Sequence, residues 1–106
     1  MREPTFFILA SLMGGPLHGY GIIKQAAEIS EGRIHLTAGT LYGALERLQS
    51  QGLVAAQGEE VVDGRARRYY RLTGPGERAL AAEADRMQQA AGVVRTGLTT
   101  LRGSPA

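Results

Sequence analysis

Four arginines stand close together in the second half of the chain and are well suited to bind an anion. Residues 61–72 contain Arg65, Arg67, Arg68 and Arg71 against Asp63 alone, a local net charge of +3 in a chain whose formal net charge is +2. Arginine makes bidentate contacts with phosphate and guanine and stacks on aromatic rings. The segment is therefore predicted to contact a polyanion, and a solvated strand edge protected by charge is the alternative.

A second candidate surface lies upstream, in a segment with helical periodicity. Leu41, Leu45 and Leu48 recur at i, i+4 and i+7 and predict a helix with one core face. The opposite face holds two glycines among larger side chains: Gly39, Thr40, Tyr42, Gly43, Glu46 and Arg47. Each glycine costs a helix roughly 1 kcal/mol. Glycine at these positions is expected where the helix backbone must come close to another surface. That surface is either the major groove of DNA or a tightly packed neighbouring helix.

Enzymatic chemistry is not predicted. The chain has no cysteine, which excludes disulfides, thiolate zinc sites and cysteine nucleophiles. Its two histidines, His18 and His35, match no nucleophile–base or metal-binding pattern. The glycine-rich residues 14–19 lack the Gly-Lys-Ser/Thr of a nucleotide loop and are interpreted as a turn. We expect no catalytic residue, metal ligand or cofactor.

Length and composition predict one small folded unit. The chain has 106 residues, of which 43% are hydrophobic, enough for a single packed core. Its longest apolar run, residues 6–12, is too short to cross a bilayer. The first four residues lack the positive segment of a signal peptide. A cytoplasmic protein without membrane contact is expected.

The elements that position these residues begin with three helices. Thr5 is expected to cap the first helix, whose residues 6–13 are apolar on nearly every face, so that it is buried all round. An amphipathic second helix is predicted over 19–30. A third helix is predicted from a cap at Thr37 to Gly52.

A hairpin and a long helix follow. Strands are predicted over 53–57 and 66–72, with Asp63-Gly64 as the turn in the polar segment between them. Thr73 is expected to cap the final helix. An apolar stripe in that helix has the 4-3 spacing of a heptad seam: Leu80, Ala84, Met87, Ala91, Val94, Leu98 and Leu101. The stripe predicts contact with a second subunit, or else packing back onto the first helix. The last four residues are expected to fray.

This order predicts an α+β fold, mainly α with a small β-hairpin: a winged helix-turn-helix with the order α-α-α-β-β-α. Residues 1–73 would form the DNA-binding unit. Residues 74–102 would form a dimerisation helix packed with the first helix into one structural unit. The six residues 31–36 between the second and third helices exceed the connection of a tight helix-turn-helix.

Four sequence motifs together resemble those of a known protein family: LHGY at 17–20, GTLYGALERL at 39–48, QGLV at 51–54 and GRARRYYRLTGPGERAL at 64–80. In this order and spacing, over about residues 4–82, the chain resembles the PadR family of transcriptional regulators. It looks most like the short subfamily, which ends in one long helix.

The resemblance implies a homodimeric repressor of a palindromic operator, with the third helix in the major groove and the hairpin on the backbone or minor groove. Arg47 is expected on the same side of the third helix as Tyr42, where it reaches a phosphate or forms an ion pair with Glu46 or Glu28. The residues expected to bind DNA are Tyr20, Thr37, Thr40, Tyr42, Arg47, Arg65, Arg67 and Arg68. Those expected at the dimer interface are Phe6, Phe7, Leu80, Met87, Val94, Leu98 and Leu101.

The resemblance also implies an effector in part of the family, because some members release DNA on binding phenolic acids or flat hydrophobic drugs at the dimer interface. This chain departs from the drug-sensing relatives because it has no tryptophan on which to stack a ligand. Tyr69 and Tyr70 are expected to be packing residues, and His18 a weaker candidate for a phosphate contact than Tyr20. A dimeric protein-interaction module without DNA binding and an RNA-binding protein remain alternatives.

Overall fold

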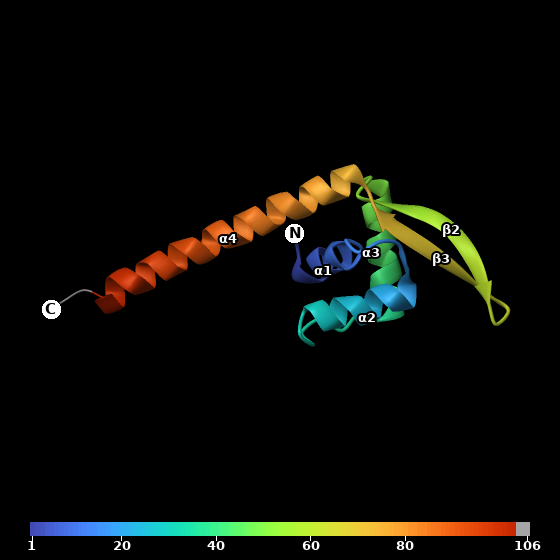
Figure 1. Ribbon diagram of the computed structural model, residues 1–106, viewed down its shortest axis with the longest axis horizontal. Helices are drawn as coiled ribbons and strands as arrows, with labels where there is room; N and C mark the ends of the chain where they lie inside the picture. The colour runs from blue at the N-terminus through green and yellow to red at the C-terminus, as the bar shows by residue number, and fades with distance from the viewer. Residues whose placement is uncertain (104–106) are drawn as a thin grey trace.

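The computed structural model describes residues 1–103 as a small helical body from which one long helix projects (Figure 1). Its elements are α1 (Glu3–Ser11), β1 (Leu17–His18), α2 (Gly19–Ile29), α3 (Ala38–Ser50), β2 (Val54–Val62), β3 (Arg65–Leu72) and α4 (Gly74–Gly103). The α+β class and the order of the four helices and the hairpin agree with the sequence prediction. The additional strand β1 does not appear in that prediction.

The core lies where α1, α2 and α3 meet. Ile8, Leu9, Ile22, Leu41 and Leu45 are its largest fully buried side chains. Residues 8–12 are buried at every position, whereas Phe6 and Phe7 are half-buried and Met13 is 67% exposed, so the prediction of a helix buried all round holds only for the end of α1. α1 is therefore the centre of the helical body.

The predicted cap at Thr5 is wrong. α1 begins at Glu3, and Arg2 holds the N-cap position without a side-chain hydrogen bond. Pro4 lies in the first turn, where its fixed φ suits the helix and its missing N–H has no cost, so the helix starts before Thr5.

The long connection between α2 and α3 belongs to the core. Ile34 and Leu36 are buried, and the Ile34 amide donates to Ser30 Oγ at 3.0 Å. At the end of the connection the Thr40 amide donates to Thr37 Oγ1 at 3.2 Å, which confirms the predicted cap of α3. Gly52 follows α3 with a φ of +74°, also as predicted.

β2 and β3 form a long antiparallel ribbon, called the wing below. Val62 pairs with Arg65 across a tight turn in which Asp63 and Gly64 have φ of 51° and 75°. The positive φ at both positions fits the predicted Asp-Gly hairpin turn. The expected end of the first strand at residue 57 is wrong, because β2 continues to Val62 past an irregularity between Ala56 and Glu59.

A third strand joins the wing to the helices. The sheet order is β1-β3-β2, and Leu17 and His18 pair with Tyr70 and Tyr69. The prediction that residues 14–19 form only a turn is therefore wrong at Leu17 and His18. Two residues are too few to show the alternating pattern of a strand. The pairing holds the start of α2 against the base of the wing.

α4 is anchored over its first three turns, where Gly76, Leu80 and Glu83 are buried, and it projects beyond them. The Gly76 amide donates to Thr73 Oγ1 at 3.0 Å, and that hydroxyl donates to the Gly52 carbonyl oxygen at 2.7 Å. Thr73 therefore caps α4 as predicted. A side chain at Gly76 would collide with the backbone of Leu53, so glycine permits the close approach of α4 to β2.

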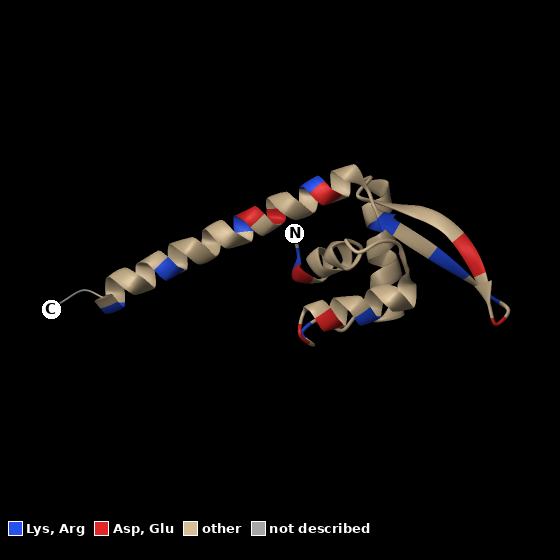
Figure 2. Cartoon of the chain, in the orientation of Figure 1, with Lys and Arg blue, Asp and Glu red and all other residues tan. Residues whose placement is uncertain are grey.

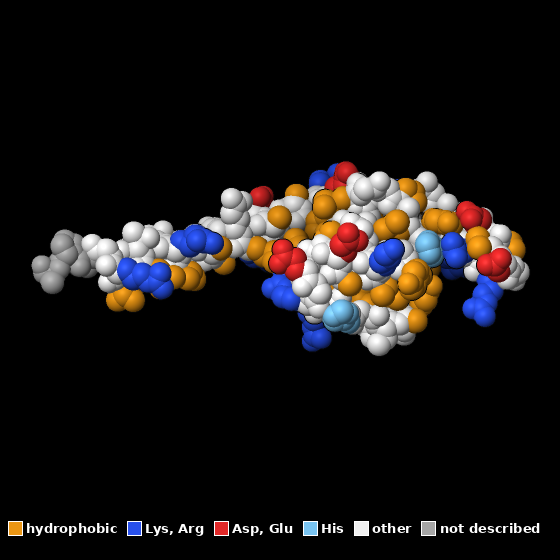
Figure 3. Space-filling model, turned by 60° about the horizontal axis from the view of Figure 1, so that its bottom comes forward, with side chains coloured by type: hydrophobic (Ala, Val, Ile, Leu, Met, Phe, Trp, Pro, Cys, Tyr) orange, Lys and Arg blue, Asp and Glu red, His pale blue; other side chains and the backbone are white. Residues whose placement is uncertain are grey.

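The apolar stripe of α4 does not fold back onto α1 beyond its first turns. Leu80 is buried, whereas Val94 is 58% exposed and Leu101 76%. Figure 3 shows hydrophobic side chains beside arginines along the projecting part of the helix. Gly103 is still helical, which corrects the expectation for that residue. Residues 104–106, the rest of the tail expected to fray, lie outside the described residues.

Candidate nucleic-acid interface

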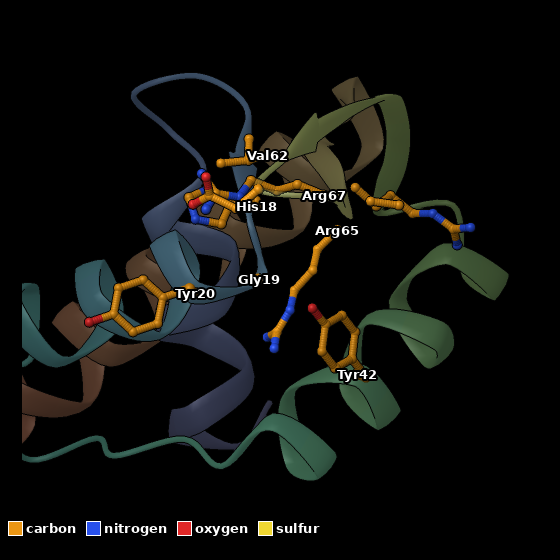
Figure 4. A pocket seen from close by; sticks show the side chains of 10 residues that line it. His18, Gly19, Tyr20, Tyr42, Val62, Arg65 and Arg67 are labelled. Atoms are coloured by element: carbon orange, nitrogen blue, oxygen red, sulfur yellow. The ribbon is translucent and has the colours of Figure 1, made fainter.

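A concavity of about 520 Å³ lies between the wing and the helices α2 and α3 (Figure 4). It is lined by His18, Gly19, Tyr20, Tyr42, Val62, Asp63, Arg65, Ala66, Arg67 and Arg68. The structure therefore brings together five of the eight residues predicted to bind DNA: Tyr20, Tyr42, Arg65, Arg67 and Arg68.

The wing supplies the positive charge. Side chains alternate along β3, so Arg65, Arg67 and Tyr69 share one face, and Arg68 and Tyr70 share the other. Tyr70 is buried in the core and Tyr69 is half-buried, which supports their assignment as packing residues. Arg68 Nη2 lies 3.8 Å from Glu59 Oε1 on β2, an exposed ion pair that contributes little to stability.

His18 links the wing to the start of α2. Its ring centroid lies 5.6 Å from that of Tyr69 and 6.4 Å from that of Tyr20, which stacks on it. Partial burial lowers the pKa of His18 below 6.5, the nearby positive charge of Arg67 lowers it further, and Glu60 acts in the opposite direction. The imidazole is consequently neutral near pH 7.

α3 presents the surface that the sequence pattern predicts. Thr37, Thr40, Gly39 and Gly43 are exposed, and Tyr42 is 50% exposed. A Cβ added at Gly39 or Gly43 would meet no atom within 4 Å, so neither glycine serves packing within this chain. The alternative of tight helix packing at these two glycines thus finds no support in the described residues.

Gly19, rather than Gly39 or Gly43, is the glycine that permits close packing between helices, a role that the sequence pattern does not predict. A Cβ at Gly19 would collide with the Tyr42 hydroxyl, so the first residue of α2 lies directly against that ring. Figure 4 shows the Arg65 side chain pointing from the wing toward Tyr42. The tight contact explains the glycine between His18 and Tyr20.

Arg47 lies apart from this group, contrary to the prediction that it shares a side with Tyr42. It lines a second concavity, of about 470 Å³, together with Arg2, Thr5 and Gln51. The two residues are five positions apart, which turns them well away from each other on a helix. Within residues 1–103 Arg47 forms no ion pair with Glu46 or Glu28, the two partners considered.

The residues expected at a dimer interface fall into two groups. Phe6 and Leu80 line an apolar concavity of about 410 Å³ between α1 and α4, and Phe7 packs edge-on against Phe6 with ring centroids 5.3 Å apart. The guanidinium of Arg33 lies over the Phe7 ring. The second group lies along the exposed stripe of α4: Met87, Val94, Leu98 and Leu101.

No helix within residues 1–103 combines the length and hydropathy needed to cross a membrane. The same residues contain no group of three His, Cys, Asp or Glu placed to hold a metal ion.

Comparison with known proteins identifies the family. Residues 8–82 match the Transcriptional regulator PadR-like family. The chain belongs to this family. The Transcriptional regulator Rv3488 of Mycobacterium tuberculosis is 38% identical over 92% of this chain and 87% of its own length.

Solved structures share the PadR fold. A PadR-family transcription regulator from Clostridium difficile R20291 has a TM-score of 0.74 at 28% identity, covering 92% of this chain and 99% of that one. Bacillus subtilis PadR, solved in complex with operator DNA, has a TM-score of 0.69 at 23% identity, covering 78% of this chain and 48% of that one. Because PadR proteins are transcriptional regulators, the assignment agrees with the prediction that the chain is not an enzyme.

Proposed function

We propose that this PadR-family chain acts as a homodimer that binds an inverted repeat in duplex DNA and represses transcription there. The observation that carries the proposal is the concavity that the wing arginines and Tyr42 of α3 line together, with the Arg65 side chain pointing toward Tyr42. Such a site offers phosphate contacts and base contacts to the same duplex. The operator complex of Bacillus subtilis PadR, which shares the fold, supports this use of it.

The predicted residues other than Arg47 then have a role at this duplex. Thr37, Thr40 and Tyr42 face the major groove from the first half of α3, where a recognition helix meets base edges. Arg65, Arg67, Arg68 and Tyr20 contact phosphates or the minor groove beside it. Arg47 lies in the second concavity, apart from this group, and no contact with the same duplex is assigned to it. The contacts of α3 with base edges determine sequence discrimination, and the contacts with phosphates contribute mainly to affinity.

The exposed stripe of α4 supports the second half of the proposal. A projecting helix with Val94, Leu98 and Leu101 in water is unfavourable unless another apolar surface covers it. The helix of a second copy has the matching heptad spacing. Two wings and two copies of α3 would then face successive half-sites of a palindrome.

We infer that a small effector binds between α1 and α4, next to the stripe by which two chains pair. The concavity lined by Phe6, Met13 and Leu80 is mainly apolar and suits a small hydrophobic or aromatic molecule. Bound there, it would turn the two heads relative to each other and change the spacing of the half-sites. A set of phenolic and planar aromatic compounds should therefore include one that alters duplex affinity in the wild type and not in Leu80→Ser.

The test of DNA binding is Arg67→Ala. Removing one phosphate contact should weaken binding to all duplexes to a similar degree and reduce the slope of log K against log salt by about one unit. Fluorescence anisotropy with labelled DNA from the upstream intergenic region, titrated across salt concentrations, measures both. Arg78→Ala on α4 removes the same charge outside the concavity and should leave the slope unchanged.

If the wild type binds duplex DNA no better than Arg67→Ala does, or binds without salt dependence, the proposal fails and the protein-interaction module becomes the better account. Stronger binding to single-stranded RNA than to duplex DNA would favour the RNA alternative.

A further inference from the structure

Two carboxylates of the wing lie near its basic residues: Asp63 in the turn lines the concavity, and Glu60 on β2 lies opposite Arg67. In the register of the ribbon, Glu60 pairs with Arg67 and Val62 pairs with Arg65. Residues opposite each other in an antiparallel pair point to the same face. Glu60 therefore shares its face with Arg65, Arg67 and Tyr69, whereas Glu59 lies on the other face. Figure 2 shows this acidic segment of β2 alongside the basic residues of β3.

Glu60 is in contact with Tyr69, which lies close to the residues predicted to bind phosphate. The Tyr69 hydroxyl donates to Glu60 Oε2 at 3.3 Å. The Tyr69 ring in turn lies against His18, whose protonation is affected in opposite directions by the charges of Arg67 and Glu60. Glu60 is exposed, so DNA that approaches Arg67 meets this carboxylate as well.

We propose that the negative charge of Glu60, the cross-strand neighbour of Arg67, repels a DNA phosphate that Arg67 binds and so limits how tightly the wing binds a duplex of any sequence. The proposal rests on the proposed function, since it requires the wing to contact DNA. A phosphate that pairs with Arg67 must displace or tolerate the negative charge of Glu60. Phosphate contacts carry no sequence information, so the cost falls equally on all duplexes and leaves discrimination by α3 unchanged.

The substitution Glu60→Gln tests this with little structural change, because the amide oxygen still accepts a hydrogen bond from Tyr69. We expect about three- to tenfold tighter binding to a duplex of arbitrary sequence at low salt, the effect of one unscreened surface charge pair. The slope of log K against log salt should steepen by about one unit. The preference for one sequence over another should stay the same.

Two further variants make the result specific. Glu28→Gln removes the same charge from an exposed site on α2 outside the concavity, and it should change affinity less than twofold, because exposed charges beyond about 10 Å are screened. In an Arg67→Ala background, Glu60→Gln should lose most of its effect, because the residue that holds a phosphate next to Glu60 is gone. Circular dichroism of each variant checks that the fold is kept.

Equal affinities for Glu60→Gln and Glu28→Gln would overturn the inference, as would an undiminished gain in the Arg67→Ala background. If Arg67→Ala weakens duplex binding but Glu60→Gln does not strengthen it, the inference alone fails. If Arg67→Ala itself changes nothing, the proposed wing contact fails with it.

Discussion

At the scale of single residues, the concavity combines permanent and conditional positive charge. The permanent charge comes from the arginines, because a guanidinium group stays charged in proteins. His18 is different, because partial burial and Arg67 hold its pKa below 6.5, so that in the free protein it is neutral near pH 7. A phosphate placed in the concavity would favour the imidazolium and raise that pKa again. Binding of DNA is therefore expected to be coupled to uptake of a proton by His18.

The coupling between DNA binding and protonation of His18 predicts how duplex affinity changes with pH. Because the pKa of His18 is higher in the complex than in the free chain, duplex affinity should rise by about threefold as the pH falls from about 7.5 to about 5.5. His18→Gln should remove this rise. Anisotropy titrations at several pH values measure it, with His35→Gln, outside the concavity, as the control. A pH dependence that is the same in all three proteins would contradict the assignment.

The lowered pKa of His18 in the free folded chain also makes the free energy of unfolding depend on pH, in the direction opposite to DNA binding. The unfolded chain protonates His18 at a higher pH than the folded chain does, so the folded state loses stability as the pH falls through 6.5 toward the lowered pKa. DNA binding and folding therefore respond to acidification with opposite signs at this residue.

At the scale of elements, the recognition surface depends on how α2 meets α3. The absent side chain of Gly19 lets the Tyr42 ring lie against the first turn of α2, and β1 holds that turn against the wing. The position of Tyr42 is thus set by packing between two helices rather than by α3 alone.

Gly19→Ala should displace Tyr42 without unfolding the protein, because the colliding atom is the far end of a side chain that can move. We expect a loss of discrimination between a preferred and a scrambled duplex of about 1 kcal/mol or more, with little change in the salt slope. Competition titrations with the two duplexes measure the ratio. Gly14→Ala, where a Cβ would meet nothing within 4 Å, should behave as wild type. A uniform loss of affinity on both duplexes would argue against a positioning role.

Elements with strong local signals could be predicted from sequence. Thr37 and Thr73 mark the starts of α3 and α4, and Asp63-Gly64 marks the hairpin turn, because caps and tight turns are set by neighbouring residues. The extension of β2 to Val62 and the pairing of Leu17 with Tyr70 depend on the partner strand, which no local pattern reveals. The contact of Gly19 with Tyr42 cannot be predicted locally for the same reason. The separation of Arg47 from Tyr42 follows from helix geometry alone, so the prediction that they share a side is wrong on that ground.

At the scale of the whole molecule, α4 determines the shape. The molecule measures 70 × 26 × 21 Å because α4 extends beyond the helical body with its apolar stripe exposed. Pairing of two chains along this stripe would give each helix a cover and would fix the distance between two concavities. DNA recognition as proposed here requires that pairing, since one head offers only one half-site.

Leu98→Asp should disrupt the pairing. A carboxylate in the middle of the stripe is costly to bury, and we expect the dimer to weaken by more than about tenfold. Light scattering after gel filtration measures the mass. Thr96→Asp places the same charge on the opposite side of α4 and should stay dimeric. A wild-type protein that is already monomeric at high concentration would remove the basis for this prediction and for the dimeric operator complex.

The most direct test of the central claim is sedimentation of the wild-type chain with a labelled duplex from the upstream intergenic DNA. We expect a complex of two chains per duplex at low salt that dissociates as salt is raised, because phosphate contacts dominate its affinity. A single chain per duplex, or a duplex that sediments alone at low salt, would contradict it.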